Sequence, residues 1–284
     1  MSFELYKPSV VQQVLAQYDL QTKKAFGQNF LVDRNVLAKI CSAAAFERDD
    51  FVLEIGPGLG VLADFAADQV ERWLAVEIDR DFEEHLARLT AAHPNFEVIY
   101  GDFLKLSLPD LVGTRCYKVV ANLPYYITSP IITKIISSQT NWQRLVFMVQ
   151  FEVAKRLTAT PGTKDYGSLT LYLQYYGQVN LVAKVSPNSF LPPPEVDSAV
   201  IAIIRHPEPP VKVEDEQLMF AIIQAAFQQR RKTLANCLKN APNLNYSSEQ
   251  VDWALAQAGI SGQRRGETLS LSEYARLSQV FAQL

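Results

Sequence analysis

The most constraining feature of this chain is a regular alternation of short apolar segments with amphipathic ones. The apolar segments lie at residues 51–55, 73–77, 96–100, 117–121 and 144–149. Segments with helical spacing of apolar residues separate most of them, including 61–70 and 81–93. Strand–helix–strand alternation at this pitch predicts a mostly parallel, doubly wound sheet with helices on both faces.

The segments that flank this alternation complete the predicted fold. Residues 9–18 have helical spacing, and Asp33 is placed to cap a second helix with Val36 on its apolar face. Two further strand candidates, 175–185 and 198–206, follow in succession. They predict an antiparallel hairpin at one edge of the sheet, which brings the expected number of strands to about seven.

A proline-rich, charged segment at 206–216 separates this region from a tail of different character. The tail has three helical stretches, LMFAIIQAAFQQRRKTLANCLK, EQVDWALAQAG and LSEYARLSQVFAQL. We therefore predict an α/β domain over residues 1–207 and a smaller helical domain over residues 208–284.

The composition argues against a metal site, a disulfide framework and a membrane span. Three cysteines are scattered without C-x-x-C spacing, and three histidines form no ligand pair. The N-terminus has no basic segment followed by an apolar run, and no apolar run reaches the roughly 20 residues that span a bilayer. We expect a metal-free, cytoplasmic protein that acts as a monomer.

The first predicted strand ends in a glycine-rich turn, EIGPGLG, with Gly56, Gly58 and Gly60. A dinucleotide fingerprint would need glycine where Val61 lies, and the G-K-[ST] of a phosphate loop is absent. The G-x-G-x-G spacing is instead typical of S-adenosylmethionine methyltransferases. A purely structural turn is the alternative interpretation of this motif alone.

The next two predicted strands also end on residues that suit a nucleoside. Glu77 ends the second strand, where a carboxylate can accept both hydroxyl hydrogens of a ribose. Asp102 follows the third strand, where it can accept from an adenine amine. Each carboxylate alone could be a solvated loop residue, but three successive strand ends with the required residues predict a nucleoside cofactor.

The fourth predicted strand runs into the stretch VVANLPYYITSP, residues 119–130. The Asn122 side-chain oxygen and the Leu123 carbonyl could accept both N–H bonds of an exocyclic adenine amine and so localise its lone pair. Pro124 would stiffen the turn, and the ring of Tyr125 could stack on the base. Such a site would act by positioning and electrostatics without a strong base.

The charge distribution is uneven, although the net charge is −3 and the pI is about 5.7. Residues 217–248 contain no acidic residue but include Arg230, Arg231 and Lys232. Lys23 and Lys24 form a second basic pair. These clusters could contact nucleic acid phosphates, and solvated helix faces are the alternative interpretation.

A set of motifs in this order and spacing resembles the bacterial small-subunit rRNA adenine dimethyltransferases, whose loss confers kasugamycin resistance. The motifs are GQNFL (27–31), EIGPGLG (54–60), EID (77–79), GD (101–102), NLPYYI (122–127), YGSL (166–169), FLPPPEVDSAV (190–200) and FQQRRKTL (227–234). The resemblance implies a Rossmann-like class I methyltransferase fold with a helical RNA-binding or ribosome-binding domain. It also implies dimethylation of two adjacent adenosines in the 3′-terminal hairpin of 16S rRNA, within an immature small subunit.

The resemblance also implies roles for individual residues. The cofactor S-adenosylmethionine would contact Gln28, Asn29, Leu31, Gly56, Gly58, Glu77, Asp102 and Asn122. The catalytic set would be Asn122, Leu123, Pro124, Tyr125 and Phe190, with the rings of Tyr125 and Phe190 on either side of a base taken out of its stack. RNA would contact Lys23, Lys24, Arg230, Arg231 and Lys232. A core aromatic residue beside a proline-rich loop is the alternative for Phe190.

Three other functions remain open at this point. The 23S rRNA adenine methyltransferases of macrolide resistance share similar motifs, although the QRRK segment and helical tail favour the small subunit. A largely non-catalytic assembly checkpoint factor or a mitochondrial transcription factor could keep the fold, but the intact NLPY motif and carboxylates argue against lost catalysis. A nicotinamide oxidoreductase is disfavoured by the glycine pattern.

Overall fold

The computed structural model describes residues 3–21, 23, 27–124 and 127–284. Its strands are β1 (Phe30–Leu31), β2 (Phe51–Ile55), β3 (Arg72–Glu77), β4 (Phe96–Tyr100), β5 (Tyr117–Asn122), β6 (Trp142–Gln150), β7 (Gly177–Val185), β8 (Phe190–Leu191) and β9 (Ser198–Arg205). Its helices are α1 (Pro8–Gln17), α2 (Arg34–Ala44), α3 (Val61–Ala66), α4 (Glu83–Ala92), α5 (Leu108–Val112), α6 (Thr128–Ser137), α7 (Phe151–Leu157), α8 (Ser168–Tyr176), α9 (Glu216–Gln228), α10 (Leu234–Lys239), α11 (Ser248–Gln257) and α12 (Leu271–Phe281).

A seven-stranded sheet with the order β4-β3-β2-β5-β6-β9-β7 forms the centre of the larger part of the chain. The pairs β2–β3, β2–β5, β3–β4 and β5–β6 are parallel, and β9 is antiparallel to β6. The predicted mostly parallel sheet is therefore confirmed, and the last two strands are neighbours at one edge. Among the described residues, no helix is long and apolar enough to cross a membrane.

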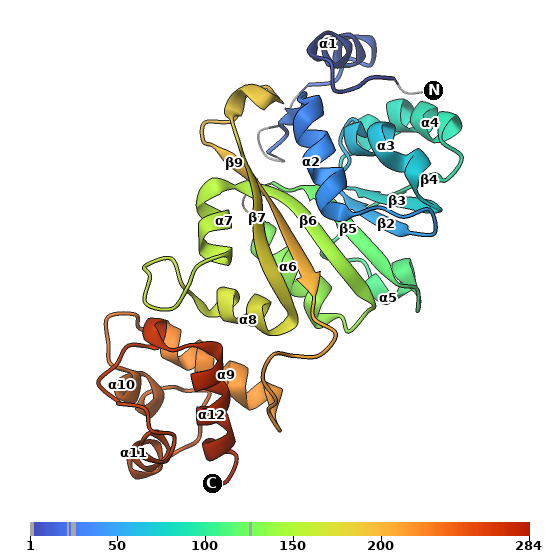
Figure 1. Cartoon of the computed structure of the whole chain (residues 1–284). Coiled ribbons are helices and arrows are strands. Elements are labelled where there is room, and N and C mark those ends of the chain that lie inside the picture. The colour runs from blue at the N-terminus through green and yellow to red at the C-terminus, as the bar shows by residue number, and fades with distance from the viewer. Residues whose placement is uncertain (1–2, 22, 24–26, 125–126) are drawn as a thin grey trace. The chain divides into compact units, whose positions relative to one another are not determined.

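Helices cover both faces of this sheet, with α2, α3 and α4 on one side and α5 and α6 on the other (Figure 1). The first face buries a cluster in which Val52, Trp73 and Val120 of the strands meet apolar side chains of α1 to α4. The predicted cap of α2 is confirmed, because the Asp33 side chain accepts from the N–H groups of Asn35 and Val36. This cap fixes the start of α2, whose apolar residues pack in the same cluster.

Contacts divide the chain into two compact units, residues 1–154 with 180–205 and residues 155–179 with 206–284. The C-terminal part of the second unit starts at residue 206, whereas the predicted first domain extends to residue 207. The prediction also placed 155–179 in the first domain, whereas the contacts group this segment with the second unit. This segment instead packs with the C-terminal helices, for example through hydrogen bonds from Tyr175 and Tyr176 to the two carboxylate oxygens of Glu216.

Two predicted elements differ in detail from the structure. The strand expected to start at residue 175 starts at Gly177, because Tyr175 and Tyr176 end α8. The helix expected to run through QQRRK is broken into α9 and α10, and Thr233 caps α10 by accepting from the N–H of Asn236. Arg230, Arg231 and Lys232 therefore lie in the turn between two helices and not on a helix face.

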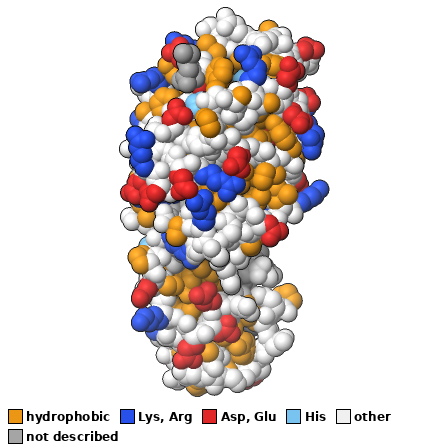
Figure 2. All heavy atoms as spheres, turned by 90° about the vertical axis from the view of Figure 1, so that its right-hand side faces the viewer, with side chains coloured by type: hydrophobic (Ala, Val, Ile, Leu, Met, Phe, Trp, Pro, Cys, Tyr) orange, Lys and Arg blue, Asp and Glu red, His pale blue; other side chains and the backbone are white. Residues whose placement is uncertain are grey.

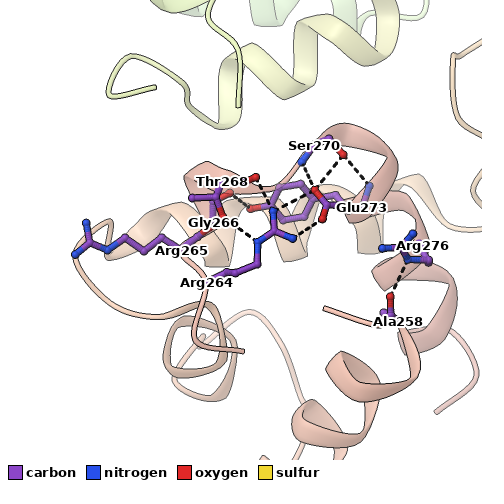
Figure 3. A network of polar contacts seen from close by, with 9 residues as sticks. Ala258, Arg264, Arg265, Gly266, Thr268, Ser270, Glu273 and Arg276 are labelled. Atoms are coloured by element: carbon purple, nitrogen blue, oxygen red, sulfur yellow. Dashed lines mark hydrogen bonds and ion pairs between the residues drawn. The ribbon is translucent and has the colours of Figure 1, made fainter. Parts of the chain in front are cut away.

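In the second unit, a polar network surrounds the start of α12 (Figure 3). Ser270 and Glu273 form a reciprocal capping box, in which each side chain accepts from the backbone N–H of the other residue. Arg264 bonds to both oxygens of Glu273 and to the Thr268 carbonyl, while the side chain of Arg265 points away from the network. The network ties the 264–268 turn to the last helix.

Candidate active site

A cavity lies where the carboxyl ends of β2, β3, β4 and β5 meet the segment Gly27–Leu31. It encloses about 1030 Å³ including its open mouth. Its lining includes three carboxyl groups, those of Glu54, Glu77 and Asp102, and no lysine, arginine or histidine among the described residues. A cavity at this edge of an open α/β sheet is where ligands of such folds bind, and its charge favours a cationic ligand.

The glycine-rich turn after β2 forms the floor of the cavity and needs glycine for two different reasons. Gly58 has a φ of +56°, and a Cβ atom there would lie 3.2 Å from the Phe30 ring. Gly60 has a φ of +74°, and a Cβ atom there would lie 2.4 Å from the Leu89 side chain. The left-handed backbone and the close packing against α4 therefore both require glycine. Gly56 lines the cavity, and a Cβ atom added there would meet no atom within 4 Å.

Glu77 is buried at the end of β3, and the backbone holds its side chain in place. Its Oε2 accepts from the N–H of Gly58 at 2.9 Å, and its Oε1 accepts from the N–H of Asp79 at 2.8 Å. Burial raises the pKa of Glu77 above the usual glutamate value, while these two hydrogen bonds oppose the rise. Each oxygen keeps a further lone pair for a ligand hydroxyl, as the prediction for this residue requires.

Asp102 follows β4 and is half-buried. Because β3 lies between β2 and β4, Asp102 and the glycine-rich turn follow the strands on either side of Glu77. Its Oδ1 accepts from the N–H of Leu104, and its Oδ2 lies 3.7 Å from the exposed Lys105 ammonium. Lys134 of α6 donates to the carbonyls of Leu104 and Leu106, which holds the loop after Asp102 in place. The carboxylate thus lies on a supported loop and lines the cavity, where it can accept from a base.

Asn122 is oriented by a residue far away in the sequence. Its Nδ2 donates to the backbone carbonyl of Asn29 at 2.8 Å, which leaves Oδ1 as an acceptor with no partner among the described residues. The N–H of Leu123 donates to the Met148 carbonyl at 3.1 Å, so the strand pairing also fixes the start of the NLPY turn. Asn122 and Pro124 both line the cavity, whereas Tyr125 lies outside the described residues.

The N-terminal segment closes one side of the cavity through Gln28, Asn29 and Leu31. The amide of Gln28 accepts from the N–H of Lys23 at 2.7 Å and donates to Asp79 at 2.8 Å. Its side chain is thus committed to holding the segment in place, and contact with a cofactor by that side chain remains a prediction. The side chain of Asn29 donates to the carbonyl of Gly27, and Leu31 is buried in β1.

Lys23 is paired with carboxylates, in contrast to the free cation that the RNA prediction assumed. Its ammonium lies 2.7 Å from Asp79 and 2.6 Å from Asp81. Although burial opposes ionisation of Asp79, the hydrogen bonds from Lys23 and Gln28 lower its pKa. These contacts join the N-terminal segment to the loop after Glu77, and Lys24 lies outside the described residues.

Phe190 is buried, with 4% of its surface exposed, and packs in the same apolar cluster as Phe30 and Leu31. Its strand β8 pairs with β1, and Phe190 stands opposite Leu31. Phe190 does not line the cavity in this structure. The burial matches the core-aromatic alternative, and the base-stacking role remains a prediction.

The three consecutive cations of the second unit have different surroundings. Arg230 donates to the carbonyls of Lys164 and Tyr166 and lies 3.1 Å from Glu267, so it holds the 155–179 segment to the C-terminal helices. Arg231 and Lys232 are exposed and make no such contact among the described residues. On the face of the molecule in Figure 2, acidic and basic side chains are interspersed.

Glu54 is a site residue that the sequence interpretation passed over. It lies inside β2, is 2% exposed and lines the cavity. Its signal was a single glutamate in the otherwise apolar strand FVLEI. A strand buried on both faces places a carboxyl group only where some other group compensates its burial.

Comparison with known proteins gives the family. The profile of the family described as ribosomal RNA adenine dimethylase matches residues 19–283. The chain belongs to this family. It is 43% identical to ribosomal RNA small subunit methyltransferase A of Geobacillus thermodenitrificans over 290 aligned positions, which cover 100% of this chain and 99% of that protein. The corresponding protein of Alkaliphilus metalliredigens is also 43% identical, with 98% of each chain covered.

Two solved structures agree with the family fold. A dimethyladenosine transferase from Plasmodium falciparum matches with a TM-score of 0.75 at 27% identity, covering 87% of this chain and 95% of that one. The 23S rRNA methyltransferase ErmE matches with a TM-score of 0.70 at 28% identity, covering 89% of this chain and 100% of that one. The rRNA adenine dimethylase family depends on S-adenosylmethionine, so the predicted methyltransferase fold and cofactor are confirmed and the oxidoreductase alternative is wrong.

Proposed function

We propose that this protein dimethylates N6 of two adjacent adenosines in the 3′-terminal hairpin of 16S rRNA, within an immature small ribosomal subunit. The small-subunit methyltransferases that are 43% identical over nearly the whole chain support this substrate. The observation that carries the proposal is the orientation of Asn122. The bond to the Asn29 carbonyl turns the Asn122 amide so that its oxygen is left to accept from an amine.

The cavity residues fit S-adenosylmethionine, because three carboxyl groups without a cation among the lining residues suit a positively charged nucleoside. When bound, this cofactor supplies an electrophilic methyl group on a sulfonium sulfur. Glu77 would accept from the ribose hydroxyls, and Asp102 would accept from the adenine amine. The apolar lining residues would exclude water from the methyl group.

At the acceptor side, the residues of the NLPY turn orient the target amine. The Asn122 side-chain oxygen and the Leu123 carbonyl accept hydrogen bonds from the two N–H groups of the amine. These bonds direct the nitrogen lone pair away from the ring. The turn is held by the pairing of Leu123 with Met148, so little reorganisation accompanies the reaction. After transfer, the nitrogen loses one proton to solvent. The methylated amine then has one N–H left, so one of the two acceptors orients it for the second methyl transfer, after which the nitrogen loses that last proton to solvent.

The domain assignment and oligomeric state form part of the proposal. The second unit would bind rRNA through Arg231 and Lys232, and the protein would act as a monomer in the cytoplasm. Methylation of 23S rRNA is the alternative, because the ErmE structure shares the fold at 28% identity. A mainly non-catalytic assembly checkpoint is the second alternative, which an intact Asn122 site disfavours.

The test is mass spectrometry of nucleosides after incubation with isotopically labelled cofactor. Small and large subunits from a strain lacking the endogenous enzyme would be treated separately with the wild-type protein and with Asn122→Ala. We expect labelled dimethyladenosine only from small subunits and only with the wild-type protein. Label in the large subunit would favour the 23S alternative, and no label at all would favour the checkpoint.

A further inference from the structure

Glu54 is an isolated carboxyl group in the wall of the cofactor cavity. Its Oε2 accepts from the indole N–H of Trp73 at 2.8 Å, and both side chains are buried. Among the described residues, its other oxygen has no hydrogen-bond partner and no cation pairs with the group. Burying a carboxylate without a cation is unfavourable, so a ligand that brings a positive charge would satisfy this group.

The strand order places Glu54 beneath one particular part of the ligand. The inference rests on the proposed function, in which Asp102 holds the adenine, Glu77 the ribose and Asn122 the target amine. Asp102 follows β4, Glu77 ends β3 and Asn122 ends β5. In the sheet, β2 with Glu54 lies between β3 and β5. Neighbouring strands are about 4.8 Å apart, so the part of the ligand between the ribose and the target amine lies over β2. That part carries the sulfur.

We propose that Glu54 determines specificity by favouring the sulfonium methyl donor over its neutral thioether product. The sulfonium charge exists only before transfer, whereas the amino-acid ammonium is present in donor and product alike. In a buried site the attraction between a carboxylate and a cation is much stronger than in water. Loss of the sulfonium charge would therefore weaken binding of the product and assist its release.

The electrostatic surroundings of Glu54 are consistent with this role. Burial raises its pKa to about 8, the Trp73 hydrogen bond opposes this rise, and the Glu77 carboxylate adds to it. Apart from the carboxyl groups of Glu77 and Asp102, the lining residues from the other elements are apolar, glycine or amide residues. Near pH 7 the free protein therefore holds Glu54 mostly protonated, and a sulfonium ligand would ionise it and release its proton to solvent.

The test is titration calorimetry of the full-length protein with three ligands: S-adenosylmethionine, S-adenosylhomocysteine, and an analogue with a protonated amine in place of the sulfonium. Glu54→Gln keeps an acceptor for Trp73 but cannot ionise. We expect this variant to weaken binding of both cationic ligands on the order of tenfold, and to leave affinity for the thioether within about twofold. Glu84→Gln removes the same charge from an exposed position on α4 and should change none of the three affinities.

Proton release supplies a readout that does not depend on affinity. Titrations near pH 7 in two buffers of different ionisation enthalpy should show release of up to about one proton on donor binding, less on product binding, and none for Glu54→Gln. Equal weakening of all three ligands would overturn the proposal, because it would mean that Glu54 binds the ammonium. An unchanged donor-to-product ratio would also overturn it, whereas failure of the wild-type protein to bind the donor would overturn the proposed function instead.

A second variant keeps the inference testable if Glu54→Gln fails to fold, which thermal unfolding would reveal. Trp73→Phe removes the N–H that stabilises the ionised form of Glu54 and retains an aromatic ring in the core. It should reduce the preference for the donor over the product in the same direction but by a smaller factor. A preference equal to that of the wild-type protein would contradict the role of the buried carboxyl group.

Discussion

Asn122 illustrates how one amide can be given a single orientation. Its Nδ2 is bonded to the carbonyl of Asn29, so rotation of the amide by half a turn would place two oxygens against each other. We expect Asn122→Ala to lower the single-turnover methylation rate on assembled small subunits on the order of a hundredfold or more, by comparison with other single positioning groups. Affinity for the subunit should change little. Near-normal methyl transfer would show that the proposed role of the NLPY turn is wrong.

Tyr125 lies outside the described residues, and its proposed role is to stack on the target base. The same single-turnover methylation assay tests this role. Tyr125→Phe should be close to wild type if the face of the ring stacks on the base. Tyr125→Ala should lose stacking of roughly 1–3 kcal/mol. Equal damage by both substitutions would mean that the hydroxyl group is needed.

Glu77 accepts from the backbone N–H groups of Gly58 and Asp79, and it is proposed to accept from the ribose of the cofactor as well. Separate variants can distinguish these two roles. Glu77→Ala should cost roughly 1.5–3 kcal/mol of cofactor binding, because hydrogen bonds to a charged acceptor are lost. Glu77→Gln keeps one oxygen acceptor toward the backbone N–H groups of Gly58 and Asp79, so it should lose less. Calorimetry measures both, with thermal unfolding as the control for the turn. An unchanged dissociation constant for Glu77→Ala would exclude the ribose assignment.

At the scale of elements, the start of α12 depends on a carboxylate that is held ionised. The Arg264 hydrogen bond lowers the pKa of Glu273 to about 2, with further bonds from Ser270. Because the folded pKa lies below the unfolded value near 4.5, this stabilisation is fully present above that value and is lost as the pH falls toward 2. Figure 3 shows the group at the junction of the 264–268 turn with the helix.

Glu273→Gln should therefore lower the free energy of unfolding by about 0.5–2 kcal/mol near pH 7, the usual range for a helix cap. The difference from the wild-type protein should shrink as the pH is lowered from 5 to 3. Chemical denaturation at several pH values measures both quantities. A difference that stays constant with pH would mean that the lost stability comes from packing and not from the charge.

At the scale of the whole molecule, variants of the basic turn between α9 and α10 can distinguish effects on RNA binding from effects on stability. Reversal of both Arg231 and Lys232 to glutamate should weaken binding to the small subunit and make its salt dependence shallower by roughly one unit of slope for each lost phosphate contact. Thermal stability and cofactor affinity should be unchanged. A salt slope equal to that of the wild-type protein would mean that neither side chain contacts RNA.

Two controls complete this experiment. Arg230→Glu should lower thermal stability as well, because Arg230 holds the carbonyls of Lys164 and Tyr166. Reversal of the exposed Lys212 in the same unit should affect neither RNA binding nor stability if the contact is local to the turn.

The sequence by itself determined the order of elements and the chemistry at the strand ends. Apolar periodicity depends on neighbouring residues only, so β2 to β6 and α1 to α4 could be predicted with nearly correct bounds. In a parallel sheet the carboxyl ends of the strands meet at one edge, so Glu77, Asp102 and Asn122 could be brought to one site without coordinates.

The tertiary structure alone decided which polar groups were already committed to partners. The bonds of Gln28 and Lys23 to Asp79 and of Arg230 to the 164–166 segment join residues that no local pattern relates. The predicted helix is interrupted at the QRRK turn, because α9 ends at Gln228 and the Thr233 hydroxyl caps the start of a new helix by accepting from the N–H of Asn236. The isolation of Glu54 depends on what every neighbouring strand places around it, and such surroundings exist only after the chain has folded.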